Sequence, residues 1–333
     1  MSARVLLAPL LESFFVDRLI RQRQASSHTV AAYRDTFRLL LAFALQRLGR
    51  EPSALELAQI DAPLVGGFLD HLEKQRGNSA RTRNARLAAI HSFFRYAALQ
   101  EPSHSAVIQR VLAMPSKRYQ RKLVGFLAPP EVKALLAAPD RSQWAGRRDY
   151  AMLLLAVQTG LRVSELIGLR RRDITLGAGA HVRCEGKGRK ERCTPLLKQT
   201  ARVLSAWLQE SPVDSGEPLF PNARGKPLSR DGVQYVLAKH ARRARQSCPS
   251  LSKKQISPHI LRHSTAMDLL HHGVDHSVIA LWLGHESPET TQMYITADMA
   301  LKQKALAKTR PPGTRAAIRF TPDDHLLAFL KGL

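Results

Sequence analysis

The chain has 333 residues, enough for two domains of ordinary size, and 44% of them are apolar, so the composition excludes an intrinsically disordered chain. Lysine and arginine number 51 against 27 aspartate and glutamate residues, which gives a formal net charge of +24 at pH 7. A positive field spread over a whole chain fits a polyanionic partner, either a nucleic acid or, as the weaker alternative, an anionic membrane surface.

The N-terminal segment is apolar but does not have the pattern of a signal peptide. The stretch 5–11 is followed at once by Glu12 and Asp17, no small-residue cleavage site is visible, and the apolar residues keep helical spacing. We therefore expect an amphipathic helix there. The longest apolar run, 150–157, is far shorter than the roughly 20 residues that cross a bilayer, so no membrane-spanning helix is expected.

The cysteine content argues against a disulfide framework and against a structural metal. Cys184, Cys193 and Cys248 are odd in number, and they form neither a CxxC motif nor a zinc-finger pattern with histidines. We expect three free thiols in a protein of the reducing cytoplasm.

Residues 1–113 are predicted to form a small helical domain, because apolar residues recur at intervals of three and four from 7 to 100. Turn signals at 49–53, 61–63 and 77–79 separate its helices.

The helix predicted at 79–99 has two different faces. Its apolar face consists of Leu87, Ile90, Phe93, Phe94 and Ala97. Its other face combines small residues with four polar or basic ones, Arg81, Asn84, His91 and Arg95. Such a face can approach a DNA duplex closely, with arginine near phosphates or guanine edges. A basic face that merely contacts solvent is the alternative.

The segment 114–130 has no periodicity and combines basic residues with prolines, which predicts an extended basic linker between two domains. The second domain, 131–310, is predicted to be helical at 130–138 and 147–170. Alternating residues at 181–185 and 191–195 flank a glycine-rich turn, the signature of a β-hairpin. Helical patterns return at 198–210, 229–246, 259–272, 275–283 and 289–308. The predicted fold is therefore mainly α, with a small antiparallel sheet in the second domain.

Two segments at the start of the second domain carry basic residues in distinctive settings. In TGLRVSEL, Arg162 follows a glycine turn and Glu165 lies three residues further on, within reach of the guanidinium. In EGKGRKE, Lys187 lies between two glycines at the expected hairpin tip, exposed and mobile. The spacing excludes a nucleotide-binding P-loop.

Two later segments add histidines, an arginine and a tyrosine. In PHILRH, His259 and Arg262 are one helical turn apart and point the same way. In LGHESPETTQMY, His285 precedes Tyr294 by nine residues. A zinc site formed by His259, His263 and His285 is disfavoured, because no acidic or cysteine ligand is near and Arg262 would place a cation beside the metal.

Taken in order, the segments TGLRVSELIGL, GKGRKER, HILRHSTA and LGHESPETTQMY resemble the tyrosine recombinase (phage integrase) family, in particular Xer-like enzymes and integrases of mobile elements. The N-terminal stretches SSHTVAAYRDTFRLLLAF and SARTRNARLAAIHSFFRYA resemble the helical core-binding, SAM-like domain of that family. The resemblance covers roughly residues 7 to 305. It implies a two-domain clamp on DNA, made of a helical core-binding domain and a mixed α/β catalytic domain.

The resemblance also implies a catalytic set at six positions, with Glu165 supporting the first arginine: Arg162, Lys187, His259, Arg262, His285 and Tyr294. The chemistry of a phosphodiester explains this set. Two guanidinium forks can bind the non-bridging oxygens, whose negative charge grows in the transition state, and so replace a metal ion.

The remaining residues suit the proton transfers and the nucleophilic attack. The tyrosine hydroxyl, with a pKa of about 10, is a weak nucleophile, so His259 is the candidate base for Tyr294. Lys187 can protonate the departing 5′-oxygen, with Lys190 as second candidate, while His285 donates a hydrogen bond to the phosphate. No cofactor and no metal are expected.

The resemblance implies a double-stranded DNA partner with specific recombination sites, and four protomers, as two dimers, that exchange strands through a Holliday junction. No membrane partner is expected. A type IB topoisomerase, acting as a monomer, is the alternative of the same chemistry. A DNA-binding regulatory protein without activity is the alternative of another class, and the complete catalytic set counts against it.

The C-terminal segment 311–333 extends beyond the length of many family members. Pro311, Pro312 and Gly313 end one helical pattern, and the sequence TPDD at 321–324 is a strong helix start. The predicted helix is only about ten residues long and rich in leucine, too short to be stable alone in water. We expect it to dock on a protein surface, either its own catalytic domain or a neighbouring protomer.

Overall fold

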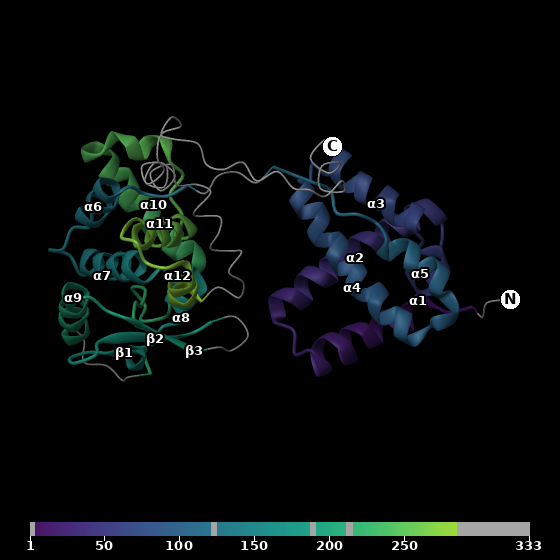
Figure 1. The fold of residues 1–333 in the computed structure, drawn as a ribbon, viewed down its shortest axis with the longest axis horizontal. Coiled ribbons are helices and arrows are strands. Elements are labelled where there is room, and N and C mark those ends of the chain that lie inside the picture. The colour runs from purple at the N-terminus through teal and green to yellow at the C-terminus, as the bar shows by residue number, and fades with distance from the viewer. Residues whose placement is uncertain (1–3, 121–124, 187–190, 211–215, 285–333) are drawn as a thin grey trace, which may run out of the picture. The chain divides into compact units, whose positions relative to one another are not determined.

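The computed structural model describes residues 4–120, 125–186, 191–210 and 216–284. The chain divides into two compact units, Met1–Arg121 and Lys122–Leu333, here called unit 1 and unit 2. Figure 1 shows unit 1 as helices alone and unit 2 as helices with a small sheet at one edge. This architecture confirms the predicted fold class.

Unit 1 is a bundle of helices that bury aromatic side chains. Its elements in chain order are α1 (Leu7–Ser13), a π-helical continuation (Phe14–Gln22), α2 (Ser27–Leu48), α3 (Ala62–Lys74), α4 (Ala80–Gln100) and α5 (Ser105–Leu112). The predicted amphipathic N-terminal helix is thus present, and Phe14 on it is fully buried. Its ring packs edge-on against Phe93 of α4, with the ring centroids 5.5 Å apart.

Capping residues set the helix boundaries in unit 1. The side chains of Ser26 and Ser79 accept hydrogen bonds from backbone N–H groups in the first turns of α2 and α4, and Asp61 does the same for α3. Gly49 ends α2 in the left-handed conformation, with φ at 64°. The apolar face predicted for the helix at 79–99 is buried as expected.

Unit 2 contains seven α-helices in its described part, together with short 3-10 helices and one sheet. The helices are α6 (Pro129–Ala137), α7 (Trp144–Thr159), α8 (Val163–Gly168), α9 (Lys198–Gln209), α10 (Arg230–Ser247), α11 (Pro258–His271) and α12 (His276–Leu283). The strands β1 (Ile174–Thr175), β2 (His181–Glu185) and β3 (Glu191–Pro195) form an antiparallel sheet in the order β1-β2-β3.

The predicted hairpin is confirmed, with His181 opposite Pro195 and Glu185 opposite Glu191. The short strand β1 is absent from the sequence prediction. The pattern at 147–170 is not one helix, because the chain breaks at Gly160 and resumes as α8. The helix predicted at 289–308 and the C-terminal segment lie outside the described residues.

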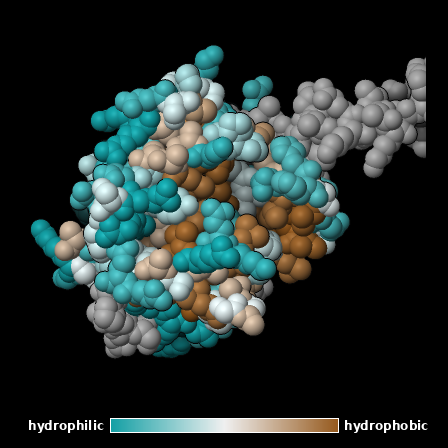
Figure 2. Space-filling model, turned by 90° about the vertical axis from the view of Figure 1, so that its left-hand side faces the viewer, coloured by the Kyte–Doolittle hydropathy of each residue, from teal (hydrophilic) through white to brown (hydrophobic). Residues whose placement is uncertain are grey.

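On the face drawn in Figure 2, hydrophilic residues predominate, and apolar residues show near the middle and towards the right. In the part of the chain that the structure describes, no helix combines the length and the apolar character that crossing a membrane requires. The thiols of Cys184, Cys193 and Cys248 are free, as expected.

Candidate active site

Gly160 breaks the chain where the first candidate arginine is needed. It ends α7 in the left-handed conformation, with φ at 64°. A Cβ atom on this residue would lie 2.6 Å from Cδ2 of Leu283. Two features therefore require glycine at this position: the left-handed turn, and the close approach of α12 to the end of α7. The turn directs Arg162 out of the helix axis, to the N-cap position of α8.

Glu165 holds Arg162 at both its backbone and its side chain. The backbone N–H of Arg162 donates to Oε2 of Glu165 at 2.7 Å, and Nη1 of Arg162 donates to Oε1 at 2.8 Å. The Glu165 side chain is buried, with 3% of its surface exposed, whereas 28% of the Arg162 side chain is exposed. The carboxylate thus fixes a guanidinium that still reaches the surface.

Arg192, which the sequence motifs do not single out, binds the same carboxylate. Its Nη1 and Nη2 atoms donate to Oε1 and Oε2 of Glu165 at 2.9 and 2.8 Å. Burial by itself would raise the pKa of Glu165, but the hydrogen bonds from Arg192 and Arg162 hold it below its usual value. In the hairpin, Arg192 is the cross-strand partner of Cys184, which is buried. The alternation of residues along the two strands is the feature of the sequence that could have indicated this position for Arg192.

Arg262 lies on α11, which begins at Pro258 after Ser257 caps its first turn. Only 5% of the residue is exposed. Its Nη1 donates to the carbonyl of Gly160 at 2.7 Å and its Nη2 to the carbonyl of Leu283 at 2.5 Å. Arg262 therefore ties together the C-terminal ends of α7 and α12.

The two candidate arginines meet at the end of α12. Nη2 of Arg162 donates to the carbonyl of Gly284 at 2.8 Å, next to the carbonyl of Leu283 that Arg262 binds. The last carbonyls of a helix have no partner within the helix and carry partial negative charge, so cations stabilise them. The two guanidinium groups therefore bind consecutive carbonyls of the chain. The residue that follows is His285.

His259 and His263 lie one turn apart on α11, with their ring centroids 6.5 Å apart. His259 is exposed. Burial, with smaller contributions from His259 and Arg262, lowers the pKa of His263 to about 4. His263 is therefore neutral at pH 7, whereas His259 is accessible for proton transfer.

Lys187, Lys190, His285 and Tyr294 lie outside the described residues. The described strands flank the hairpin tip that carries Lys187 and Lys190. Within the described ranges, no three His, Cys, Asp or Glu side chains are grouped to hold a metal ion.

The four DNA-contact candidates of unit 1 differ in their surroundings. Arg81 and Arg95 are exposed on α4. Asn84 pairs with the backbone of Lys117, accepting from its N–H at 2.9 Å and donating to its carbonyl at 2.8 Å. The His91 ring lies 3.0 Å from the carbonyl of Val111, and burial is the main reason its pKa is lowered. Asn84 and His91 thus have partners within unit 1.

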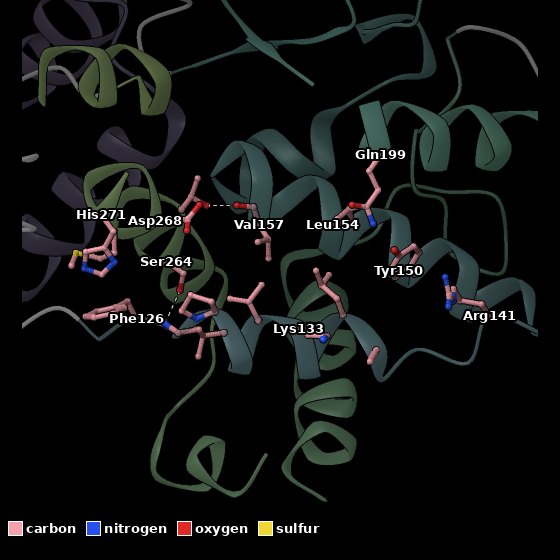
Figure 3. Close-up of a pocket in the computed structure, with 17 residues that line it drawn as sticks. Phe126, Lys133, Arg141, Tyr150, Leu154, Val157, Gln199, Ser264, Asp268 and His271 are labelled. Carbon is pink, nitrogen blue, oxygen red and sulfur yellow. Dashed lines mark hydrogen bonds between the residues drawn. The ribbon is translucent and has the colours of Figure 1, made fainter. Parts of the chain in front are cut away.

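A separate pocket of about 460 Å³ lies between α6, α7 and α11 (Figure 3). Its floor is apolar, Asp268 and His271 lie at one end, and Arg141 lies at the other. Arg162, Glu165, Arg192 and Arg262 do not line it. This pocket is therefore distinct from the arginine cluster.

The arginine cluster has the properties of a site for a phosphodiester. Two guanidinium groups, fixed by backbone carbonyls and by a carboxylate, converge beside the end of α12. Preorganised charge-assisted donors of this kind stabilise negative charge that develops on phosphate oxygens without reorganising during the reaction.

Comparison with known proteins identifies the family of the chain. Residues 125–300 match the model of the phage integrase family, and residues 13–101 match the phage integrase N-terminal SAM-like domain. The Sinorhizobium fredii protein y4rC is 61% identical over 333 residues, which cover 100% of this chain and 100% of y4rC. Its name assigns y4rC to the integrases or recombinases. The tyrosine recombinase XerC of Pelobacter propionicus is 36% identical over 311 residues, covering 91% of this chain and 98% of XerC.

Solved structures share the fold. The site-specific recombinase XerH, in a post-cleavage complex with a palindromic difH substrate, superposes with a TM-score of 0.69 at 23% identity over 92% of this chain and 91% of XerH. The Tn1549 transposon integrase in complex with circular intermediate DNA gives a TM-score of 0.67 at 15% identity, over 92% of this chain and 100% of that one. The chain therefore belongs to the phage integrase family, the tyrosine recombinases, which catalyse DNA strand breakage and rejoining.

Proposed function

We propose that this chain recombines DNA at specific sites and that Tyr294 is its nucleophile. The tyrosine attacks a phosphodiester, a 3′-phosphotyrosyl bond forms and a DNA 5′-hydroxyl leaves. A 5′-hydroxyl of a second strand then attacks that bond, restores the diester and frees the tyrosine. Bond energy is conserved at each step, so no nucleotide hydrolysis is required. Exchange of the two strand pairs in turn passes through a Holliday junction.

The observation that carries this proposal is the convergence of Arg162 and Arg262 on consecutive carbonyls at the end of α12. In this proposal both arginines bind the non-bridging oxygens of the scissile phosphate. His259 accepts the tyrosine proton, Lys187 protonates the 5′-oxygen and His285 donates to the phosphate. No cofactor or metal takes part.

A nicked duplex that traps the cleaved state tests the proposal. Loss of a short 5′-hydroxyl strand prevents rejoining, so the protein should accumulate as a detergent-resistant adduct with DNA, and excess EDTA should not reduce the yield. Tyr294→Phe should bind the same duplex with unchanged affinity and form no adduct. Adduct formed by the Phe variant, or cleavage lost on chelation, would contradict the proposal.

We further propose duplex DNA with specific recombination sites as the partner, bound by two dimers of this chain in the cytoplasm. The support is the net charge of +24 and the DNA complexes of structural neighbours such as XerH. In this arrangement residues 1–113 and 131–310 form the two halves of the clamp, and 114–130 links them. A supercoiled plasmid with one site tests for topoisomerase activity, and a plasmid with two sites tests for recombination.

Arg81 and Arg95 are the proposed phosphate contacts of unit 1, since both are exposed on α4. For B-DNA, log K falls against log salt by about 0.9 for each neutralised phosphate. Arg81→Ala and Arg95→Ala should each lower this slope by about 1. Equilibrium binding between low and moderate salt measures the slope, and Asn84→Ala serves as the comparison. An unchanged slope in both arginine variants would place this face in solvent.

For the segment 311–333 we propose docking on a neighbouring protomer, in the pocket of Figure 3. The segment combines the leucine-rich stretch with Asp323 and Asp324 at its start and Lys331 near its end. The pocket offers an apolar floor with Arg141 at one end and Asp268 at the other. In this docking, the two aspartates of the segment would lie near Arg141, and Lys331 would lie near Asp268.

Deleting residues 316–333 should leave binding of one protomer to a half-site nearly intact, because the clamp remains. It should weaken cooperative binding of a second protomer and abolish recombination, since the proposed contact between protomers is removed. Gel-shift titrations on half-sites and full sites separate the two effects. A truncated protein that recombines at the normal rate, or that unfolds, would contradict docking between protomers.

A further inference from the structure

Arg192 stands where three parts of the proposed active site meet. It lies on β3, the second strand of the hairpin whose tip carries Lys187. Its guanidinium forms a two-pronged ion pair with Glu165, and only 12% of its side chain is exposed. A Cβ atom on Gly284 would lie 2.7 Å from Nη1 of Arg192, so the arginine fills the space that this glycine leaves.

Arg192 gives the charges around Glu165 a positive excess. One buried carboxylate accepts hydrogen bonds from both Arg162 and Arg192, so the three side chains carry a net charge of +1. If Arg192 were absent, the carboxylate would pair with Arg162 alone, and that pair would be neutral. The attraction of Arg162 for a phosphate would then be opposed by an adjacent negative charge in a partly desolvated site.

The geometry has the same consequence. Arg192 binds both oxygens of Glu165 through two hydrogen bonds, which restrict the rotation of the carboxylate. The carboxylate in turn fixes Nη1 and the backbone N–H of Arg162. Arg192 on β3 therefore positions the carboxylate of Glu165, and the carboxylate positions the partly exposed guanidinium of Arg162.

We infer that Arg192 is a positioning residue for strand cleavage: it neutralises and orients Glu165, so that the cluster keeps a net positive charge and Arg162 keeps its direction toward the scissile phosphate. The inference rests on the proposed function, because it needs Arg162 to bind that phosphate. It assigns Arg192 to stabilisation of the phosphate and not to protonation of the leaving group.

Arg192→Met keeps an unbranched apolar side chain in place of the arginine stem and removes the guanidinium with its charge. Single-turnover cleavage of the nicked duplex should slow about 10²-fold, as for loss of a preorganised donor. The dissociation constant for DNA should change less than about threefold, because most of the binding comes from other phosphate contacts. Arg183→Met, on the neighbouring strand and 3.8 Å from Asp173 instead, is the matched control and should cleave within about threefold of wild type.

A second substitution separates charge from packing. Adding Glu165→Gln to Arg192→Met removes the negative charge beside Arg162 and restores a net charge of +1. The double variant should therefore cleave at least about tenfold faster than Arg192→Met, a non-additive result. Arg192→Lys, which keeps the charge but not the two-pronged contact, should fall between wild type and Arg192→Met. The midpoint of thermal unfolding, measured for each variant, identifies any loss of rate that comes from unfolding.

A duplex with sulfur in place of the leaving 5′-oxygen tests the assignment to the phosphate. Such a leaving group needs little protonation, so the defect of Arg192→Met should persist. Rescue by sulfur would assign Arg192 to the Lys187 hairpin and overturn the inference, and so would wild-type cleavage by Arg192→Met or no recovery in the double variant. Failure of the wild-type protein itself to form an adduct would instead refute the proposed function.

Discussion

Arg162→Ala is expected to reduce the rate of strand cleavage by about 10²-fold or more while DNA affinity changes little. The guanidinium is needed most when negative charge grows on the phosphate oxygens, so its loss raises the barrier by about 2.7 kcal/mol or more. The fold should tolerate the change, because Arg192 still neutralises Glu165 and 28% of the Arg162 side chain already faces solvent. Single-turnover cleavage and equilibrium binding on one duplex measure the two quantities.

Arg262 requires a different design, because its removal affects the core. The side chain is 5% exposed and satisfies the carbonyls of Gly160 and Leu283. Leaving buried carbonyls without a donor costs about 1–3 kcal/mol each, so Arg262→Ala should lower the unfolding midpoint as well as the rate. Arg262→Lys retains a cation and is the better probe of catalysis. If either arginine variant lost only affinity, that residue would be a phosphate anchor.

The second large effect is expected at Lys187. If its ammonium protonates the departing 5′-oxygen, Lys187→Ala should slow cleavage by about 10²- to 10⁴-fold, the usual contribution of a general acid. Lys190→Ala on the same hairpin tip is the matched control and should have a much smaller effect. Both variants should bind the duplex like the wild-type protein, since each removes one of 51 basic residues.

Sulfur in place of the leaving oxygen distinguishes proton transfer from positioning. A thiolate leaves without a proton, so Lys187→Ala should cleave this substrate at nearly the wild-type rate. The arginine variants should remain slow on it, because the phosphate still needs their charge. A defect of Lys187→Ala that persists on sulfur would transfer the role to Lys190 or make Lys187 a positioning residue.

Local sequence predicted most of the helices and the hairpin. Periodicity located the helices of both units because each buries one face, and the glycine-rich turn between alternating residues located β2 and β3. The pair Arg162 and Glu165 was predictable because three residues separate them. The sequence indicated a glycine turn before Arg162, but it did not show that the helix ends there, because apolar residues recur on both sides of Gly160.

Contacts between distant segments could not be predicted from the sequence. Arg192 binds a carboxylate 27 residues away, which depends on the register of β2 and β3. Asn84 and His91 were placed correctly on the polar face of α4, but their partners lie 33 and 20 residues further on, at Lys117 and Val111. The meeting of Arg162 and Arg262 at Leu283 and Gly284 needs three helices to pack first.

Mass spectrometry of the trapped adduct identifies the residue that is joined to DNA. After nuclease and protease digestion we expect a single modified peptide, with a nucleotide 3′-phosphate on the hydroxyl of Tyr294. A modification on another residue, or a linkage through a 5′-phosphate, would refute covalent catalysis by this tyrosine.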